Sequence, residues 1–152
     1  MLTYRTRFIY ITLLGLALLI FFIVSRLMSH QIHVDWSSTG EWIVFSCGVY
    51  TNNDQDTWSR LYIVRPDGSS LQRITGDEFV AMSPTWSPDG MWIAFINRGK
   101  EIVKIRPDGT YSETILHADP LDSIVDVDWS PTQDTVVYNT FAYQSSSIRL
   151  VN

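Results

Sequence analysis

The sequence offers few residues whose type and spacing would support catalysis. Its 152 residues contain no Gly-x-Ser-x-Gly segment, the turn that presents the nucleophile of many serine hydrolases. The three histidines, His30, His33 and His117, are scattered, and only the first two have helical spacing. Because a zinc site needs three or four convergent ligands, these histidines do not predict one. We expect no catalytic residue, no metal and no cofactor.

In two places along the chain, acidic or amide residues occupy every second position. Asn and Asp at 52–56 resemble the first three ligands of a calcium loop, but Thr57 and Ile63 stand where such a loop needs Gly and Glu. A solvated loop is therefore the better interpretation. Asp126 and Asp128 lie on a predicted strand, where we expect them to face a central channel or to bond neighbouring backbone.

The single cysteine, Cys47, has no partner for an intrachain disulfide. An unpaired cysteine in an exported protein can be a reactive thiol. Cys47 lies in the apolar segment 42–47, and buried cysteines usually behave as small hydrophobic residues. We therefore expect Cys47 to be buried.

The elements that would position any site are internal repeats. Segments 35–45, 85–95 and 128–138 align, and each begins with a residue followed by Trp-Ser. A second element that ends in Arg-Pro-Asp-Gly recurs at 61–68 and 102–109. The tryptophans are 50 and 43 residues apart, close to the ~40–45 residues of a propeller blade. The extra residues of the first repeat fall between 48 and 59.

Each repeat predicts four short strands, a to d. Ser-Pro-Asp-Gly closes the a–b turn with residues suited to a type I turn, and Arg-Pro-Asp-Gly closes the c–d turn. Strand b is apolar on both faces, as a strand between neighbouring blades must be. The residues of the Trp-Ser repeat motif are Trp36, Gly40, Trp86, Pro88, Asp89, Gly90, Trp129 and Pro131.

This pattern resembles the TolB-like β-propeller repeat family, whose signature is Trp-Ser-Pro-Asp-Gly, an apolar strand, and a strand ending in Asp-Gly. The resemblance covers roughly residues 34–152. Blade one has Ser38-Thr39-Gly40 in place of Pro-Asp-Gly, and blade three, with segment 131–134, lacks the turn glycine. The resemblance implies an interaction platform or a cap on a serine peptidase.

The predicted fold is therefore all-β: about two and a half four-stranded antiparallel blades, an incomplete ring, after one N-terminal transmembrane helix. Blade one spans 34–75, blade two 84–116 and partial blade three 124–152, which ends on strand c. Propellers close with typically 4–8 blades. We expect further blades from a longer gene product or, as the alternative, several copies that complete a ring.

The ends of this stack should be open. On blade one, half of the surface of Trp42, Val44 and Phe45 should lie exposed, and Ile148 to Val151 should form a free edge. We therefore expect the blades alone to self-associate, to need a downstream segment, or to be degraded.

Residues 8–28 predict a transmembrane anchor, because positions 8–24 carry no charge and a bilayer needs roughly 20 helical residues. A cleaved signal peptide is the alternative, but no convincing small-x-small site follows. Arg5 and Arg7 precede the segment and Arg26 follows it, so residues 1–7 should form a cytoplasmic tail. The linker 29–33 and the blades would lie on the periplasmic or extracellular side of the cell membrane.

Charge excludes one class of partner. Eight basic and sixteen acidic residues follow the apolar segment, a net charge of −8. A nucleic-acid binder would show a basic patch instead. We expect the lipid bilayer, through residues 8–28, and another protein or further blades as partners.

Successive strands of a blade reverse direction, so the b–c and d–a loops share one face of the molecule. Functional residues concentrate on variable loops held by a rigid scaffold. The loop face is predicted to be acidic with exposed aromatic residues, and its candidate binding residues are Tyr50, Asp54, Asp56, Trp58, Asp77, Glu78, Phe79, Asp119 and Asp122.

The sequence therefore favours a membrane-tethered, non-catalytic protein-binding or scaffold module. The alternative is the propeller cap of a larger serine peptidase or hydrolase whose catalytic domain lies elsewhere.

Overall fold

The computed structural model describes residues 33–49, 58–142 and 145–151, and every regular element in these ranges is a β-strand. The predicted tail, the anchor at 8–28 and most of the linker lie outside the described residues. Among the described residues, no helix has the length and apolar character needed to cross a membrane.

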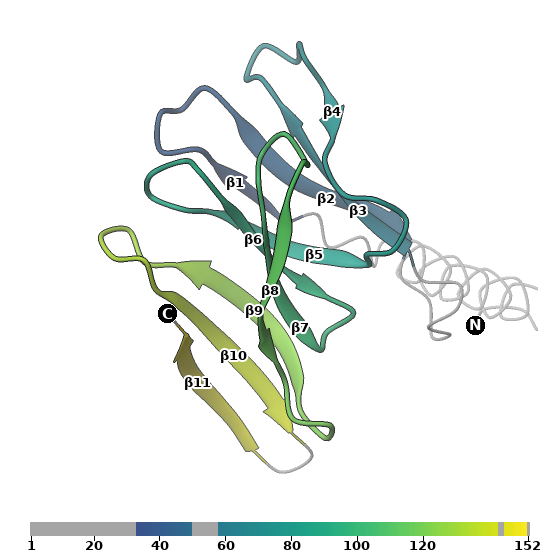
Figure 1. Ribbon diagram of the computed structural model, residues 1–152, viewed down its shortest axis with the longest axis vertical. Coiled ribbons are helices and arrows are strands. Elements are labelled where there is room, and N and C mark those ends of the chain that lie inside the picture. The colour runs from purple at the N-terminus through teal and green to yellow at the C-terminus, as the bar shows by residue number, and fades with distance from the viewer. Residues whose placement is uncertain (1–32, 50–57, 143–144, 152) are drawn as a thin grey trace, which may run out of the picture. The chain divides into compact units, whose positions relative to one another are not determined.

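Three antiparallel sheets follow one another along the chain (Figure 1). The first has four strands, β1 (Val34–Trp36), β2 (Ile43–Val49), β3 (Trp58–Val64) and β4 (Gln72–Arg73). The second also has four, β5 (Ala81–Trp86), β6 (Ile93–Asn97), β7 (Glu101–Ile105) and β8 (Ser112–His117). The third has three described strands, β9 (Ser123–Trp129), β10 (Val136–Ala142) and β11 (Ser145–Val151). Within each sheet every strand pairs with the next one along the chain, as in the blades of a propeller.

Hydrophobic patterning places the sheets face to face. All five residues of β6 are buried, which confirms for blade two that strand b is covered on both faces. In blade one, Ile43 and Phe45 of β2 are only half-buried. One apolar cluster joins the first two sheets and includes Val44, Leu61, Trp86 and Phe95. A second cluster joins the last two sheets around Ile96, Trp129 and others.

The tight turns have the predicted form. The amide of Gly90 donates to the carbonyl of Ser87 at 2.9 Å, and the amide of Gly40 donates to Ser37 at 2.8 Å. Both glycines have positive φ, +69° and +71°, which side chains other than glycine rarely adopt. In blade three, which lacks the glycine, the Ser130 hydroxyl instead accepts amide bonds from two turn residues.

Each aspartate of the Pro-Asp-Gly turns accepts a hydrogen bond from the backbone amide two residues further along the chain. Asp89 Oδ1 accepts the Ser87 hydroxyl at 2.6 Å and the Met91 amide at 2.9 Å. Because the Ser87 hydrogen bond favours the ionised form, the pKa of Asp89 lies below its usual value. Asp67 and Asp108 occupy the same place in the c–d turns, and hydrogen bonds from the residues two positions on lower the pKa of each.

Exposure at the two ends of the stack differs in part from expectation. Trp42 and Phe45 are half-buried, but Val44 is fully buried rather than open, because it faces the second sheet. Cys47 is exposed, so the prediction that it is buried was wrong. Successive side chains of a strand point to opposite faces, so Val44 and Ser46 lie on the buried face of β2 and Cys47 lies on the other face, which no described sheet covers. Ile148 and Leu150 are exposed, as predicted for a free third strand.

Candidate functional site

The predicted loop-face residues are only partly described. Tyr50, Asp54 and Asp56 lie outside the described residues. Trp58 begins β3 and is 46% exposed. Glu78 is exposed on the connection to β5. These two remain available to a partner.

Asp77 is exposed but is not a free charge. One of its carboxylate oxygens lies 2.5 Å from the Arg73 guanidinium and 3.3 Å from that of Arg60. Hydrogen bonds from Arg73 and then Arg60 lower the pKa of Asp77. The charge predicted for this loop is therefore balanced by two arginines.

The remaining loop-face candidates are packed or paired. Phe79 is half-buried rather than an exposed aromatic, because its ring packs edge-on against Phe95 at 5.4 Å. Asp122 is buried, and its carboxylate lies 3.4 Å from Arg149. Asp119 is exposed and lies 3.9 Å from the same arginine. The described part of the loop face is thus less acidic than its sequence indicates.

A hollow of about 370 Å³ lies instead on the opposite, tight-turn face, where the first strands of the three blades end. Its polar centre is formed by one residue from each blade, Asp35, Thr85 and Asp128, each of which precedes a Trp-Ser motif. The Thr85 hydroxyl lies 3.2 Å from Asp35 Oδ2 and 3.1 Å from Asp128 Oδ1. The equivalent strand positions thus bring two carboxylates to one hydroxyl.

The same residues connect the blades through the backbone. Asp35 Oδ2 accepts the amide of Trp86, in the next blade, at 2.8 Å. The Thr85 hydroxyl oxygen lies 3.4 Å from the amide of Trp129, again one blade further on. Asp128 accepts its neighbour's amide, that of Trp129, and Asp126 accepts that of Val127, as predicted for carboxylates that bond local backbone.

The Thr85 hydroxyl has a single proton, so it can donate a hydrogen bond to only one of the two carboxylates at a time. One carboxylate oxygen therefore lacks that donor at any moment. Each of the two oxygens also accepts a tryptophan amide, so a cationic ligand group would add a contact to carboxylates that already have one donor.

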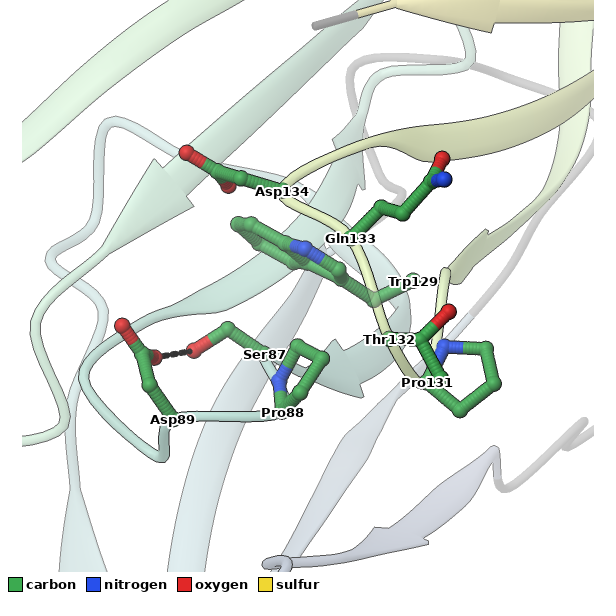
Figure 2. A pocket seen from close by; sticks show the side chains of 8 residues that line it. All are labelled: Ser87, Pro88, Asp89, Trp129, Pro131, Thr132, Gln133 and Asp134. Atoms are coloured by element: carbon green, nitrogen blue, oxygen red, sulfur yellow. Dashed lines mark hydrogen bonds between the residues drawn. The ribbon is translucent and has the colours of Figure 1, made fainter.

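A second hollow, of about 220 Å³, adjoins the first between the a–b turns of blades two and three (Figure 2). Figure 2 shows the Trp129 indole between these two turns. The Nε1 atoms of Trp86 and Trp129 are buried and have no hydrogen-bond partner. The eight residues around this hollow are Ser87, Pro88, Asp89, Trp129, Pro131, Thr132, Gln133 and Asp134.

The two hollows on the tight-turn face are acidic, although Arg106 of a c–d turn interacts electrostatically with Asp89. No lysine or arginine lines either hollow. In the part of the chain that the structure describes, no salt bridge reaches the four carboxylates that line them, Asp35, Asp89, Asp128 and Asp134. Within the same ranges, no three His, Cys, Asp or Glu side chains are grouped to hold a metal ion. The arrangement suits recognition of a positively charged group.

The sequence analysis expected Asp128 at a central channel or against local backbone, but it did not group Asp128 with Asp35 and Thr85, because it favoured variable loops over tight turns. A signal was present, however. The residue before each Trp-Ser motif is Asp, Thr or Asp, and equivalent positions in repeats come together at one edge of the stack.

No family model matches the chain. Its sequence is 34% identical over 77 residues to dipeptidyl-peptidase 5 of Porphyromonas endodontalis, a match that covers 49% of this chain and 11% of the relative. It is 32% identical over 76 residues to a TolB homologue of Chlorobium luteolum, which covers 49% of this chain and 16% of the relative. The chain thus matches less than a fifth of the length of either curated relative.

A solved structure described as TolB from Agrobacterium tumefaciens is similar to the fold, with a TM-score of 0.61 and 25% identity. The likeness covers 78% of this chain and 44% of that one.

Proposed function

We propose that this chain, whose repeats are of the TolB-like propeller type, is a membrane-tethered, non-catalytic module that binds another protein. The predicted anchor at 8–28 would hold the blades at the outer surface of the cytoplasmic membrane. Propellers of this kind serve as interaction platforms, which supports a protein as the partner.

The tight-turn face is the observation that carries the proposal. Its two adjoining hollows contain carboxylates without salt bridges and the half-open indole of Trp36, which is 54% exposed. A lysine or arginine side chain is attracted both to carboxylates and to the face of an indole. We therefore assign to this face a protein segment that presents a basic side chain.

Binding of short peptides to the full chain in detergent tests the assignment. Four fluorescent peptides would share one backbone sequence and differ only in a central Arg, Lys, Ala or Glu. We expect the Arg and Lys peptides to bind at least ~10-fold more tightly than the Glu peptide, because each close charge pair contributes on the order of 1 kcal/mol or more.

Matched variants locate the effect. Asp35→Asn with Asp128→Asn keeps an acceptor oxygen at both positions but removes both charges, and should abolish the preference for basic peptides. Asp119→Asn, on the loop face, should leave it unchanged. Equal binding of all four peptides, or a preference that survives the double substitution, would contradict the assignment.

The second candidate function is the propeller part of a larger serine peptidase. It is favoured by the 34% identity to a dipeptidyl-peptidase over half of this chain. The coding sequence that follows residue 152 decides between the two. A domain with Gly-x-Ser-x-Gly would favour the peptidase, whereas further blades and a stop codon would favour the binding module.

A further inference from the structure

A group of aromatic and basic side chains lies on blade two beside its tight turns. Trp92 follows the a–b turn, while Lys104 lies on β7 and Arg106 directly after it. The Arg106 guanidinium carbon lies 4.0 Å from the centre of the Trp92 ring, and the Lys104 ammonium lies 4.9 Å from it. The Tyr111 ring meets the same indole edge-on at 5.9 Å. We call these four residues the basic cluster.

The two cations of the basic cluster differ in how their charge is balanced. Lys104 lies opposite Glu113 in the pair of β7 with β8, and its ammonium is 3.3 Å from the Glu113 carboxylate. Arg106 forms no salt bridge with any residue that the structure describes, although Asp89 and Asp108 interact with it electrostatically. Of the two cations, Arg106 is therefore the one that can take a further anion.

Stacking on the indole leaves the donors of Arg106 directed outward. A guanidinium carries five N–H groups in one plane, so a ring against its face does not use them. Its Nη1 donates to the Met91 carbonyl at 3.3 Å, the one hydrogen bond of this side chain to another described residue. A carboxylate can accept two parallel N–H groups from an arginine held in this way. The geometry of Arg106 therefore suits a carboxylate ligand.

Blade one offers a comparison at the equivalent positions. Arg65 lies 4.7 Å over Trp42, so the stacked pair itself recurs and joins the a–b and c–d turns of each blade. By register, however, Ile63 and Ser70 stand where blade two has its lysine and its tyrosine. Ile63 is only 4% exposed. Of the two four-stranded blades, blade two is therefore the one that adds a second cation and a second ring to the pair.

The exposure of the basic cluster does not require that the chain end at residue 152. Arg65 is exposed although blade two, with all four of its strands, packs against blade one. The equivalent Arg106 would keep the same exposure beside a third blade with four strands. At the edge of the cluster, Tyr111 and Met91 are 53% and 50% exposed. A ligand can therefore reach the cluster from solvent.

The basic cluster adjoins the acidic hollow between blades two and three. The Met91 amide donates to Asp89, which lines that hollow, and the Met91 carbonyl accepts from Arg106. A single residue thus separates a negatively charged wall from a positively charged one. Three extended residues span about 10 Å, so one short segment can reach both.

We infer that the partner segment of the proposed function, on which this step rests, carries an acidic side chain within about three residues of its basic one, and that this carboxylate binds Arg106. Specificity then comes from repulsion as well as attraction. A segment with two basic residues would bring a like charge to Arg106, and one with two acidic residues would bring a like charge to the aspartates of the hollows.

Peptide binding to the full chain in detergent tests the inference. Every peptide keeps the central Arg, and one of the positions up to three residues on either side of it is Glu, Gln or Lys. We expect at least one position where the Glu peptide binds ~5-fold more tightly than its Gln isostere, because charge-assisted bonds to a held guanidinium exceed those of a mobile surface pair. At that position the Lys peptide should bind more weakly than either.

Substitutions on the chain separate the two sites. Arg106→Gln should abolish the preference for Glu over Gln but leave the preference for Arg over Glu at the central position. Asp35→Asn with Asp128→Asn should do the reverse. Arg106→Lys should retain only part of the preference for Glu, since lysine keeps the charge but lacks the planar pair of donors.

Arg65→Gln is the matched control, because it removes the equivalent stacked arginine from blade one. Both arginine variants should lower the urea midpoint, but Arg65→Gln should leave both peptide preferences unchanged. A Glu preference that is absent at every position, survives Arg106→Gln, or is lost equally in Arg65→Gln would overturn the inference. If the central preference is absent while a Glu preference that depends on Arg106 remains, the proposed function fails and the carboxylate site stands.

Discussion

At the scale of single residues, the repeated tryptophans show that exposure depends on neighbours rather than on residue type. Trp36, Trp86 and Trp129 share a motif and a strand position, yet only the last two have a preceding blade against them. Their indoles therefore contribute to the core, while that of Trp36 does not.

Replacement of Trp86 by Ala should destabilise the blades severely. Truncation of a buried aromatic residue in a core costs about 3–5 kcal/mol, and Trp86 is 7% exposed between two sheets. Urea-dependent proteolysis of the full chain in detergent measures the loss. Leu121→Ala, at an exposed position, should stay within ~0.5 kcal/mol of the parent; equal resistance of parent and Trp86→Ala would contradict the blade assignment.

At the scale of elements, the tight turns contain a glycine whose positive φ other residues rarely adopt and an aspartate whose hydrogen bonds favour its ionised form. The two features give separate predictions, because one depends on sterics and the other on pH.

The turn aspartates should make stability depend on acid pH. The pKa values of Asp67, Asp89 and Asp108 lie below the unfolded value of 3.8. Their contribution is therefore complete above that value and is lost as the pH falls below it toward the folded pKa values. Replacement of all three by Asn should flatten urea midpoints between about pH 5 and pH 2 relative to the parent. Superimposable pH profiles would contradict this account.

Two glycines at the same turn position separate backbone strain from packing. Gly68 and Gly109 both have positive φ, +83° and +76°, so Ala should cost roughly 1–2 kcal/mol at either. A Cβ on Gly68 would meet nothing within 4 Å, but one on Gly109 would lie 2.8 Å from the Ile74 carbonyl oxygen in the neighbouring blade. Gly109→Ala should therefore lower the urea midpoint more than Gly68→Ala. The reverse order would show that the c–d turn does not contact blade one.

The strands and turns were predictable because they follow local rules. Alternation, apolar runs and Ser-Pro-Asp-Gly each act within a few residues, and β6 and the Gly90 turn formed as expected. The burial of Phe79, the exposure of Cys47 and the Asp35–Thr85–Asp128 contact depend instead on which sheet lies opposite. Local sequence patterns do not show which sheet packs against which, so they do not predict those contacts.

At the scale of the whole molecule, the predicted anchor would determine on which side of the membrane the blades lie. Residues 8–28 should remain in the mature protein, because their uncharged run is long enough to span a bilayer. Carbonate extraction followed by N-terminal sequencing checks this: we expect membrane-retained protein that begins at residue 1 or 2. Released protein with its N-terminus near residue 30 would indicate a cleaved signal peptide. Leu16→Arg should reduce retention, since a central arginine costs about 2.5–3.5 kcal/mol.

The contact from Asp35 to the Trp86 amide has a consequence for the history of such chains. In both described junctions, a side-chain oxygen on the first strand of one repeat faces the tryptophan amide on the first strand of the next, so the two junctions use equivalent positions. Unequal recombination can then add or delete a whole repeat in the gene and still leave matched junctions. The number of repeats is free to change over generations, and selection acts chiefly on what meets the first and last of them.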